Sequence, residues 1–432
     1  MVAPNLSVTV EPSEEGSVVY LPLAARTSAD EPNAQLSLVL TIKNNEATTV
    51  HVNDVTLAFA GPPAIGNVSI PVDVALNANQ TKLWYFATAN NVILPLPAPG
   101  SFTASLACDG FSEPATVPNT MAPYTSSLPE GGYLFPGHVS DLAGGEFWAG
   151  QSAVHAPAGG GVQLFAYDMD VVGYDPTSDQ LSVLAPGGSW NKNEDYRIWG
   201  KHILAVADGT VHSWADDQPT NPNPPADLSP PGPVEGNHFY IQHGSDLILY
   251  AHLQPGSLNP MLLEPKKPVA AGEFLGLAGN SGNSSRPHLH LHAIRGTQPW
   301  QGPPRPIPFR DINVIDRSVL NPPDPSGPWV VVNGQGFPSV PAAIWPSATK
   351  PISLWIPWVH ALAIDPLALI LRPDIYVKLT LPDPPPIDLF LRQVREVIEA
   401  MSIEDRRLAL GRVELYQKQL AALEREIREV SS

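Results

Sequence analysis

Three histidines at alternate positions are the feature of this sequence with the clearest chemical potential. His288, His290 and His292 occupy positions i, i+2 and i+4 of the run Pro287-His-Leu-His-Leu-His. Side chains with this spacing project from one face of a β-strand, where neutral imidazoles can converge on a metal ion or a bound water. A polar strand whose histidines face solvent or satisfy one another is the competing interpretation, and the neighbouring sequence has to decide between the two.

The sequence before this strand supplies elements that can position it. Residues 236–253 form two alternating runs joined at His243, and they predict a β-hairpin that ends at His252. Residues 279–285, Gly-Asn-Ser-Gly-Asn-Ser-Ser, predict a flexible loop that delivers the chain to His288. A hairpin, a loop and a histidine-bearing strand therefore follow one another.

These blocks resemble the lysostaphin-like (LytM-type) zinc endopeptidases, which cleave peptide bonds in bacterial cell-wall crosslinks. Ala-Val-Ala-Asp-Gly-Thr-Val at 205–211 is similar to the family's opening strand pair, and 236–253 is similar to its central hairpin ending in Tyr-x-His-Leu. Residues 276–290 are similar to its closing motif, Gly-x-x-Gly-Asn-Ser-Gly followed by Pro-His-Leu-His. The resemblance covers residues 155–295, about a third of the chain.

The resemblance implies a role for each of three histidines. The second histidine of the closing motif, His290, would be a zinc ligand. His252 and His288 would be the catalytic pair, which does not bind the metal but orients and deprotonates the water.

The family's other two ligands come from a His-x-x-x-Asp element, and here the chain departs from the pattern because Leu164 stands four residues before Asp168. Residues 163–168 nevertheless resemble a variant, Gln-x-Tyr-Ala-x-Asp, that supplies the aspartate while the histidine lies farther back. The resemblance then implies Asp168 and His155 as ligands, joined by a glycine-rich loop that is flexible enough to bring them together. The fallback carboxylates are Asp170 and Asp175.

Two histidines, one aspartate and a water in the fourth position make the open tetrahedral arrangement expected of a catalytic zinc. Zinc lowers the pKa of the water and polarises the scissile carbonyl, while an imidazole serves first as base and then as acid towards the leaving amine. The implied function is a zinc-dependent endopeptidase acting on a peptidoglycan peptide or a protein. The alternative is a catalytically silent protein of the same fold that binds cell wall or a protein partner.

Four further residues are expected to support the ligands or to line the cleft. His243 lies in a family-like Ile-x-His-Gly turn, and His292 stands where relatives often have an acidic residue. Tyr250 and Asn280 belong to the hairpin and closing motifs that carry the resemblance.

The chain as a whole is predicted to be mainly β, with four regions. Residues 1–125 alternate apolar and polar positions in short runs and predict an Ig-like β-sandwich, either a spacer or a binding domain. Residues 126–300 form the LytM-type antiparallel domain, with a proline-rich insertion at 218–233 that predicts a surface loop. Residues 301–384 are expected to be an irregular proline-rich wrap. Residues 385–432 predict amphipathic helices, as a hairpin or an arm, that pack on the chain itself or dock on another copy or partner.

Composition limits the partners and the compartment. A net charge of -18 argues against nucleic acid, because phosphate binding relies on Lys and Arg. The single Cys108 excludes an intrachain disulfide. The first residues lack the basic and apolar regions of a signal peptide, and no run of 18 apolar residues occurs. We therefore expect a chain without a membrane span that is cytoplasmic as synthesised, or exported by an unconventional route.

Overall fold

The computed structural model describes residues 2–347 with interruptions, of which the longest are 25–32, 125–131, 151–160, 223–231 and 318–328. The predicted helices at 385–432 and the predicted ligand His155 lie outside the described residues. Within the described part the protein is mainly β, and its only helices are three 3-10 turns, η2 (Val139–Asp141), η4 (Asn193–Asp195) and η5 (Pro260–Leu262). No helix in this part is long and apolar enough to cross a membrane.

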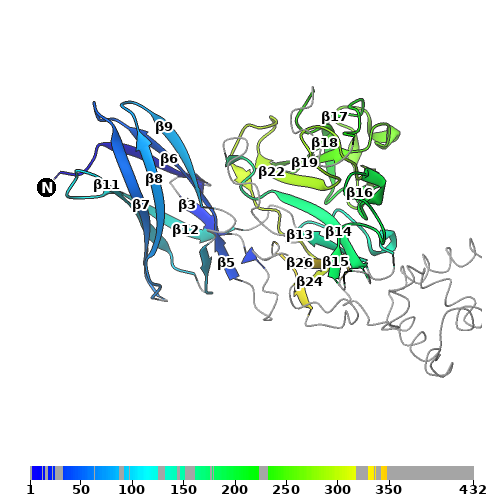
Figure 1. The fold of residues 1–432 in the computed structure, drawn as a ribbon, viewed down its shortest axis with the longest axis horizontal. Coiled ribbons are helices and arrows are strands. Elements are labelled where there is room, and N and C mark those ends of the chain that lie inside the picture. The colour runs from blue at the N-terminus through cyan, green and yellow to red at the C-terminus, as the bar shows by residue number, and fades with distance from the viewer. Residues whose placement is uncertain are drawn as a thin grey trace, which may run out of the picture.

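Figure 1 shows the N-terminal strands as a lobe. This lobe has its own hydrophobic core. It contains a six-stranded sheet in the order β2-β3-β12-β11-β7-β8 and two three-stranded sheets, β1-β6-β9 and β10-β5-β4. Buried and partly exposed residues alternate along β11, as the pleat of a strand with one face on a core requires. The more specific Ig-like assignment stays a prediction. The strands of this lobe are β1 (Leu6–Glu11), β2 (Ser13–Glu14), β3 (Val18–Leu21), β4 (Leu23–Ala24), β5 (Asn33–Leu36), β6 (Leu38–Asn44), β7 (Val50–Ala60), β8 (Val68–Leu76), β9 (Thr81–Phe86), β10 (Val92–Leu94), β11 (Ser101–Cys108) and β12 (Ala115–Pro123).

The second lobe is built on a twelve-stranded sheet whose main path runs β20-β17-β18-β19-β22-β14-β13-β26-β24-β25 (Figure 1). Two further strands of this sheet lie off the path, β15 paired with β14 and β23 paired with β22. A separate pair, β16 and β21, completes it. The strands are β13 (Glu146–Gly150), β14 (Tyr167–Asp175), β15 (Gln180–Ser182), β16 (His202–Leu204), β17 (Gly209–Ala215), β18 (Asn237–His243), β19 (Asp246–Leu253), β20 (Pro268–Val269), β21 (Phe274–Leu277), β22 (Leu289–Arg295), β23 (Pro304–Arg305), β24 (Ile312–Asp316), β25 (Val330–Val332) and β26 (Ala342–Trp345).

The structure differs from the sequence expectation after residue 300. Instead of an irregular wrap, the described part of 301–347 supplies four strands to the same sheet, three of them joined to β13 through β26. The runs in β24, β25 and β26 are short and rich in β-branched or small apolar residues, which suit a buried strand, and the prolines fall mostly between them. The sheet therefore extends well beyond the predicted boundary.

The two faces of the sheet near β19, β22 and β14 have different characters. Leu289, Leu291 and Tyr250 belong to the main hydrophobic core on one face. Because side chains alternate along a strand, His290 and His292 lie on the other face, beside the smaller cluster that contains Leu249, Ala251 and Tyr240. The two histidines of β22 thus share one side of the sheet.

Candidate active site

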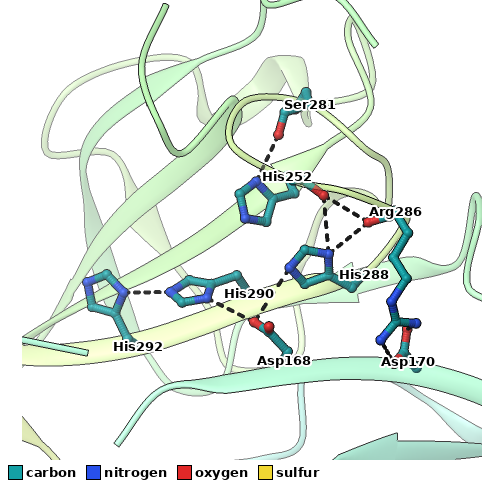
Figure 2. A network of polar contacts seen from close by, with 9 residues as sticks. Asp168, Asp170, His252, Ser281, Arg286, His288, His290 and His292 are labelled. Atoms are coloured by element: carbon teal, nitrogen blue, oxygen red, sulfur yellow. Dashed lines mark hydrogen bonds and ion pairs between the residues drawn. The ribbon is translucent and has the colours of Figure 1, made fainter. Parts of the chain in front are cut away.

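The centre of the candidate site is a carboxylate that lies between two imidazoles (Figure 2). Asp168 on β14 is the ladder partner of His290 on β22, so pairing of the two strands brings together residues 122 positions apart in sequence. Asp168 Oδ1 lies 3.0 Å from His290 Nδ1 and 3.5 Å from His288 Nε2. All three side chains are buried or partly buried, which strengthens the electrostatic interaction among them.

His252 reaches the same site because the end of β19 is distorted. The register of β18 against β19 shifts between Asn237 and Phe239, which leaves an extra residue on β19, and His252 has a φ of 66°. A bulge of this kind re-aims a side chain and interrupts the alternation of faces. The His252 ring consequently lies 4.7 Å from the His288 ring and 5.9 Å from the His290 ring, between centroids.

Residues 279–287, which we call the closing loop, orient both candidate catalytic rings. His252 Nδ1 lies 2.8 Å from the Ser281 carbonyl oxygen, and His288 Nδ1 lies 2.8 Å from the Arg286 carbonyl oxygen (Figure 2). A carbonyl oxygen only accepts, so each Nδ1 must carry the proton and donate it. In the neutral rings Nε2 is therefore the unprotonated nitrogen, which is the state needed to accept a proton.

The burial of His252 reinforces this protonation state. Burial lowers its pKa well below the ordinary value, and the neighbouring rings of His288 and His290 lower it further. The charge of Asp168 and the hydrogen bond to Ser281 oppose the shift without cancelling it. His252 is accordingly a neutral imidazole at pH 7.

A second carboxylate on β14, that of Asp170, forms an ion pair with Arg286. Arg286 donates from both terminal nitrogens to Asp170, at 2.9 Å to each oxygen, in a bidentate ion pair. Burial raises the pKa of Asp170, while the guanidinium of Arg286 lowers it. The pair fastens the closing loop to β14 beside Asp168. The other fallback carboxylate, Asp175, accepts a hydrogen bond from Ser178 at the far end of the strand.

The four residues expected near the ligands divide into separate networks. His292 Nδ1 lies 2.9 Å from His290 Nε2, on the same face as the site. Tyr250 and His243 are instead joined to each other at 3.0 Å between the hydroxyl and Nε2, and Tyr250 lies in the main core on the opposite face. Asn280 is fully buried and donates to Asn193 Oδ1 at 2.8 Å.

The donor chemistry of the described residues matches part of a zinc site. A carboxylate oxygen and an imidazole nitrogen, from Asp168 and His290, are ligand types that zinc takes, and they face each other. Among the described residues no group of three or more His, Cys, Asp or Glu has the arrangement of a metal site. Leu164, four residues before Asp168, is a fully buried apolar residue. His155, the predicted third ligand, lies outside the described residues.

Sequence reasoning did not identify Ser281 or Arg286 as contributors to this site. Each orients a histidine through its backbone carbonyl, whose use leaves no mark on residue type.

The second lobe gathers an Asp–His pair and two further oriented imidazoles beside one β-sheet. Residues 193–301 match the model of Peptidase family M23, so the chain contains a domain of this family, and the predicted LytM-type resemblance is confirmed there. The matched stretch includes His252, His288 and His290 and begins after Asp168.

Several solved structures are similar to parts of the chain. A mutant catalytic domain of the prophage-encoded M23 protein EnpA from Enterococcus faecalis is 20% identical, over 25% of this chain and 68% of that one, with a TM-score of 0.18. A putative peptidase M23 from Pseudomonas aeruginosa is 14% identical, over 59% and 87%, with a TM-score of 0.21. A zinc-containing peptidase from Vibrio cholerae is 12% identical, over 64% and 85%, with a TM-score of 0.23. A comparison with curated proteins finds no match to this sequence.

Proposed function

We propose that this protein is a zinc-dependent endopeptidase that hydrolyses peptide bonds in peptidoglycan crosslinks. The observation that carries the proposal is the orientation of two histidines: His252 and His288 each donate Nδ1–H to a backbone carbonyl, which leaves Nε2 to accept a proton next to the Asp168 and His290 pair. A binding protein has no need of two imidazoles held in the tautomer of a base. The M23 match, which includes His252, His288 and His290, supports a peptidase role for these three residues.

In this proposal Asp168 and His290 would hold zinc, with His155 as the third ligand. A zinc ion there would supply Lewis acidity, which lowers the pKa of water and polarises a peptide carbonyl. His252 and His288 would do the proton work: Nε2 of one ring accepts a proton from the attacking water, and the imidazolium then protonates the amine of the leaving peptide. His292 would receive a hydrogen bond from Nε2–H of His290, which keeps Nδ1 of His290 available to a metal.

A catalytically silent binding protein is the second candidate function, and Leu164 is the observation that favours it. An apolar residue at the family's usual ligand position removes one donor, and a site with fewer ligands binds zinc more weakly. This protein would still recognise cell wall or a protein partner through the same cleft.

Metal content distinguishes the two candidates. The wild type, His290→Ala and His155→Ala are compared by metal analysis, with His212→Ala as a matched control because His212 lies on β17 outside the site. The peptidase proposal expects about one zinc per chain in the wild type and the control, and a large loss in both ligand variants. A wild type without zinc would favour the silent protein, and zinc retained by His155→Ala would refute that ligand assignment.

The flanking regions are proposed as accessory parts. Residues 1–125 would act as a spacer or a binding domain, and residues 385–432 would be helices that dock on the body, another copy or a partner. Light scattering on the full chain and on a chain ending at residue 384 tests the last idea. A monomer in both cases would argue against a role of the tail in assembly.

A further inference from the structure

Asn221 connects the proline-rich insertion to the closing loop. Asn221 is buried, with 6% of the residue exposed. The sequence, in contrast, predicts a surface loop for the surrounding segment, 218–233. Asn221 Nδ2 donates to the carbonyl oxygens of Gly282 at 2.8 Å and Ser284 at 2.9 Å. Its backbone N–H donates to the carbonyl oxygen of Asn280 at 2.7 Å. One residue thus makes three hydrogen bonds to one loop.

Two of the three bonds of Asn221, those to Gly282 and Ser284, fall between the two carbonyls that orient the histidines. Ser281 accepts from His252, and Arg286 accepts from His288, so the contacts at residues 282 and 284 fix the segment that separates them. Ser284 adds a link of its own, since its hydroxyl donates to the Arg286 carbonyl at 2.8 Å. A shift of this segment would move both orienting carbonyls together.

Two more asparagines hold Asn221 in place. Asn193 Nδ2 donates to the Asn221 carbonyl oxygen at 2.7 Å, and Asn193 Oδ1 accepts from Asn280 Nδ2 at 2.8 Å. All three asparagines are buried and come from η4, the insertion and the closing loop. Buried amides are costly unless they are hydrogen-bonded, so these bonds strongly favour the one loop conformation that satisfies them.

We propose that Asn221 is a positioning residue for the M23 site: it holds the closing loop so that the Ser281 and Arg286 carbonyls keep His252 and His288 as Nδ1–H tautomers. Asn221 does not touch the reacting atoms. Its effect on turnover rests on the proposed peptidase function, whereas its effect on the tautomers does not. The ligand pair Asp168 and His290 lies on strands rather than on the loop, so Asn221 leaves metal binding largely unaffected.

The test replaces Asn221 with aspartate in the full chain. Asn221→Asp has nearly the same shape, but its carboxylate cannot donate and repels the carbonyls of Gly282 and Ser284. Asn191→Asp is the matched control, since Asn191 is exposed and its side-chain oxygen accepts a hydrogen bond from Ser189, two residues earlier in the same loop. The readouts are the imidazole ¹⁵N spectra of protein labelled at histidine, kcat and KM on a crosslinked muropeptide, and zinc affinity.

We expect Asn221→Asp to lose the Nδ1–H signature of both His252 and His288, whose signals are assigned from His252→Gln and His288→Gln. Loss of two buried hydrogen bonds should lower kcat at least about tenfold, with KM and zinc affinity within about threefold of the wild type. The control should resemble the wild type in every readout. A purely structural role of Asn221 would lower thermal stability without changing the tautomers.

Unchanged tautomers in a folded Asn221→Asp protein would overturn the proposal, and so would the same change in the control. If Asn221→Asp does not fold, Asn221→Ala removes both side-chain donors without adding charge, and the tautomer shift should then be smaller and in the same direction. A wild type that cleaves no muropeptide would refute the peptidase function, while the spectra would still decide the role of Asn221.

Discussion

Acidification should destabilise the second lobe through His243, a histidine buried on β18. Its Nδ1–H donates to the Asp208 carbonyl oxygen at 3.1 Å, and its Nε2 accepts from the Tyr250 hydroxyl at 3.0 Å. Burial lowers the pKa of His243 from 6.5 to about 4, against the opposing effect of Asp208. A protonated ring could not accept from Tyr250 and would leave a charge in the core.

The sign of the effect follows from proton binding. Between pH 4 and 6.5 the unfolded chain holds a proton on this ring that the folded chain lacks, so the free energy of unfolding rises with pH. The stabilisation is complete above the unfolded pKa of 6.5 and is lost as the pH falls towards 4. One pKa unit corresponds to about 1.4 kcal/mol, so the total for this single group is about 3 kcal/mol.

The assay is urea denaturation followed by tryptophan fluorescence at pH 4.5 to 7.5, with a chelator present so that metal binding does not contribute. In His243→Gln we expect the loss of stability between pH 7 and 4.5 to be smaller than in the wild type by about 2 to 3 kcal/mol. His212→Gln, at a partly exposed position on β17, is the control and should keep the pH dependence of the wild type. The reasoning is refuted if His243→Gln and the wild type lose the same stability on acidification.

Three further outcomes are expected. A double-mutant cycle of Asp170→Asn and Arg286→Gln should give a coupling energy of about 1 kcal/mol, which is low because the Arg286 side chain is 38% exposed. A coupling energy near zero would contradict the idea that this ion pair fastens the closing loop to β14. His252→Gly should be more stable than His252→Ala by about 1 kcal/mol in thermal unfolding, because only glycine tolerates a φ of 66° without strain. The reverse order of stability would show that this backbone is unstrained. Burial raises the pKa of the Cys108 thiol to about 11. Iodoacetamide at pH 8 should therefore alkylate Cys108 at least about a hundredfold more slowly in the native protein than in the unfolded chain. Equal rates would contradict the burial of Cys108.

The hairpin and the histidine strand could be predicted from the sequence because their signals are local. Alternation over residues 236–253 corresponds to β18 and β19, and His290 and His292 lie on β22, whereas His288 directly precedes that strand. The strands after residue 300 could not be predicted, because their runs are short and their stability comes from neighbours such as β13, far away in sequence.

The site was predicted in part, and the bulge in β19 explains one limit. The sequence predicts Tyr250 near the ligands or in the cleft and His252 in the catalytic pair, and strict alternation would place both side chains on the same face. The left-handed backbone at His252 separates them, so Tyr250 and His243 lie in the core while His252 faces the site. The approach of Asp168 to His290 depends on pairing between distant strands, and only the family resemblance pointed to it.

The central claim is that Asp168, His290 and the two oriented histidines carry out zinc-dependent peptide hydrolysis. The most direct measurement follows cleavage of purified crosslinked muropeptides by mass spectrometry with the native protein, after chelation, and after adding back zinc. The account predicts cleavage at a peptide bond that chelation abolishes and about one equivalent of zinc restores, with none in His288→Ala or His252→Ala. Cleavage that survives chelation, or a fully zinc-loaded wild type that leaves every crosslink intact, would contradict it.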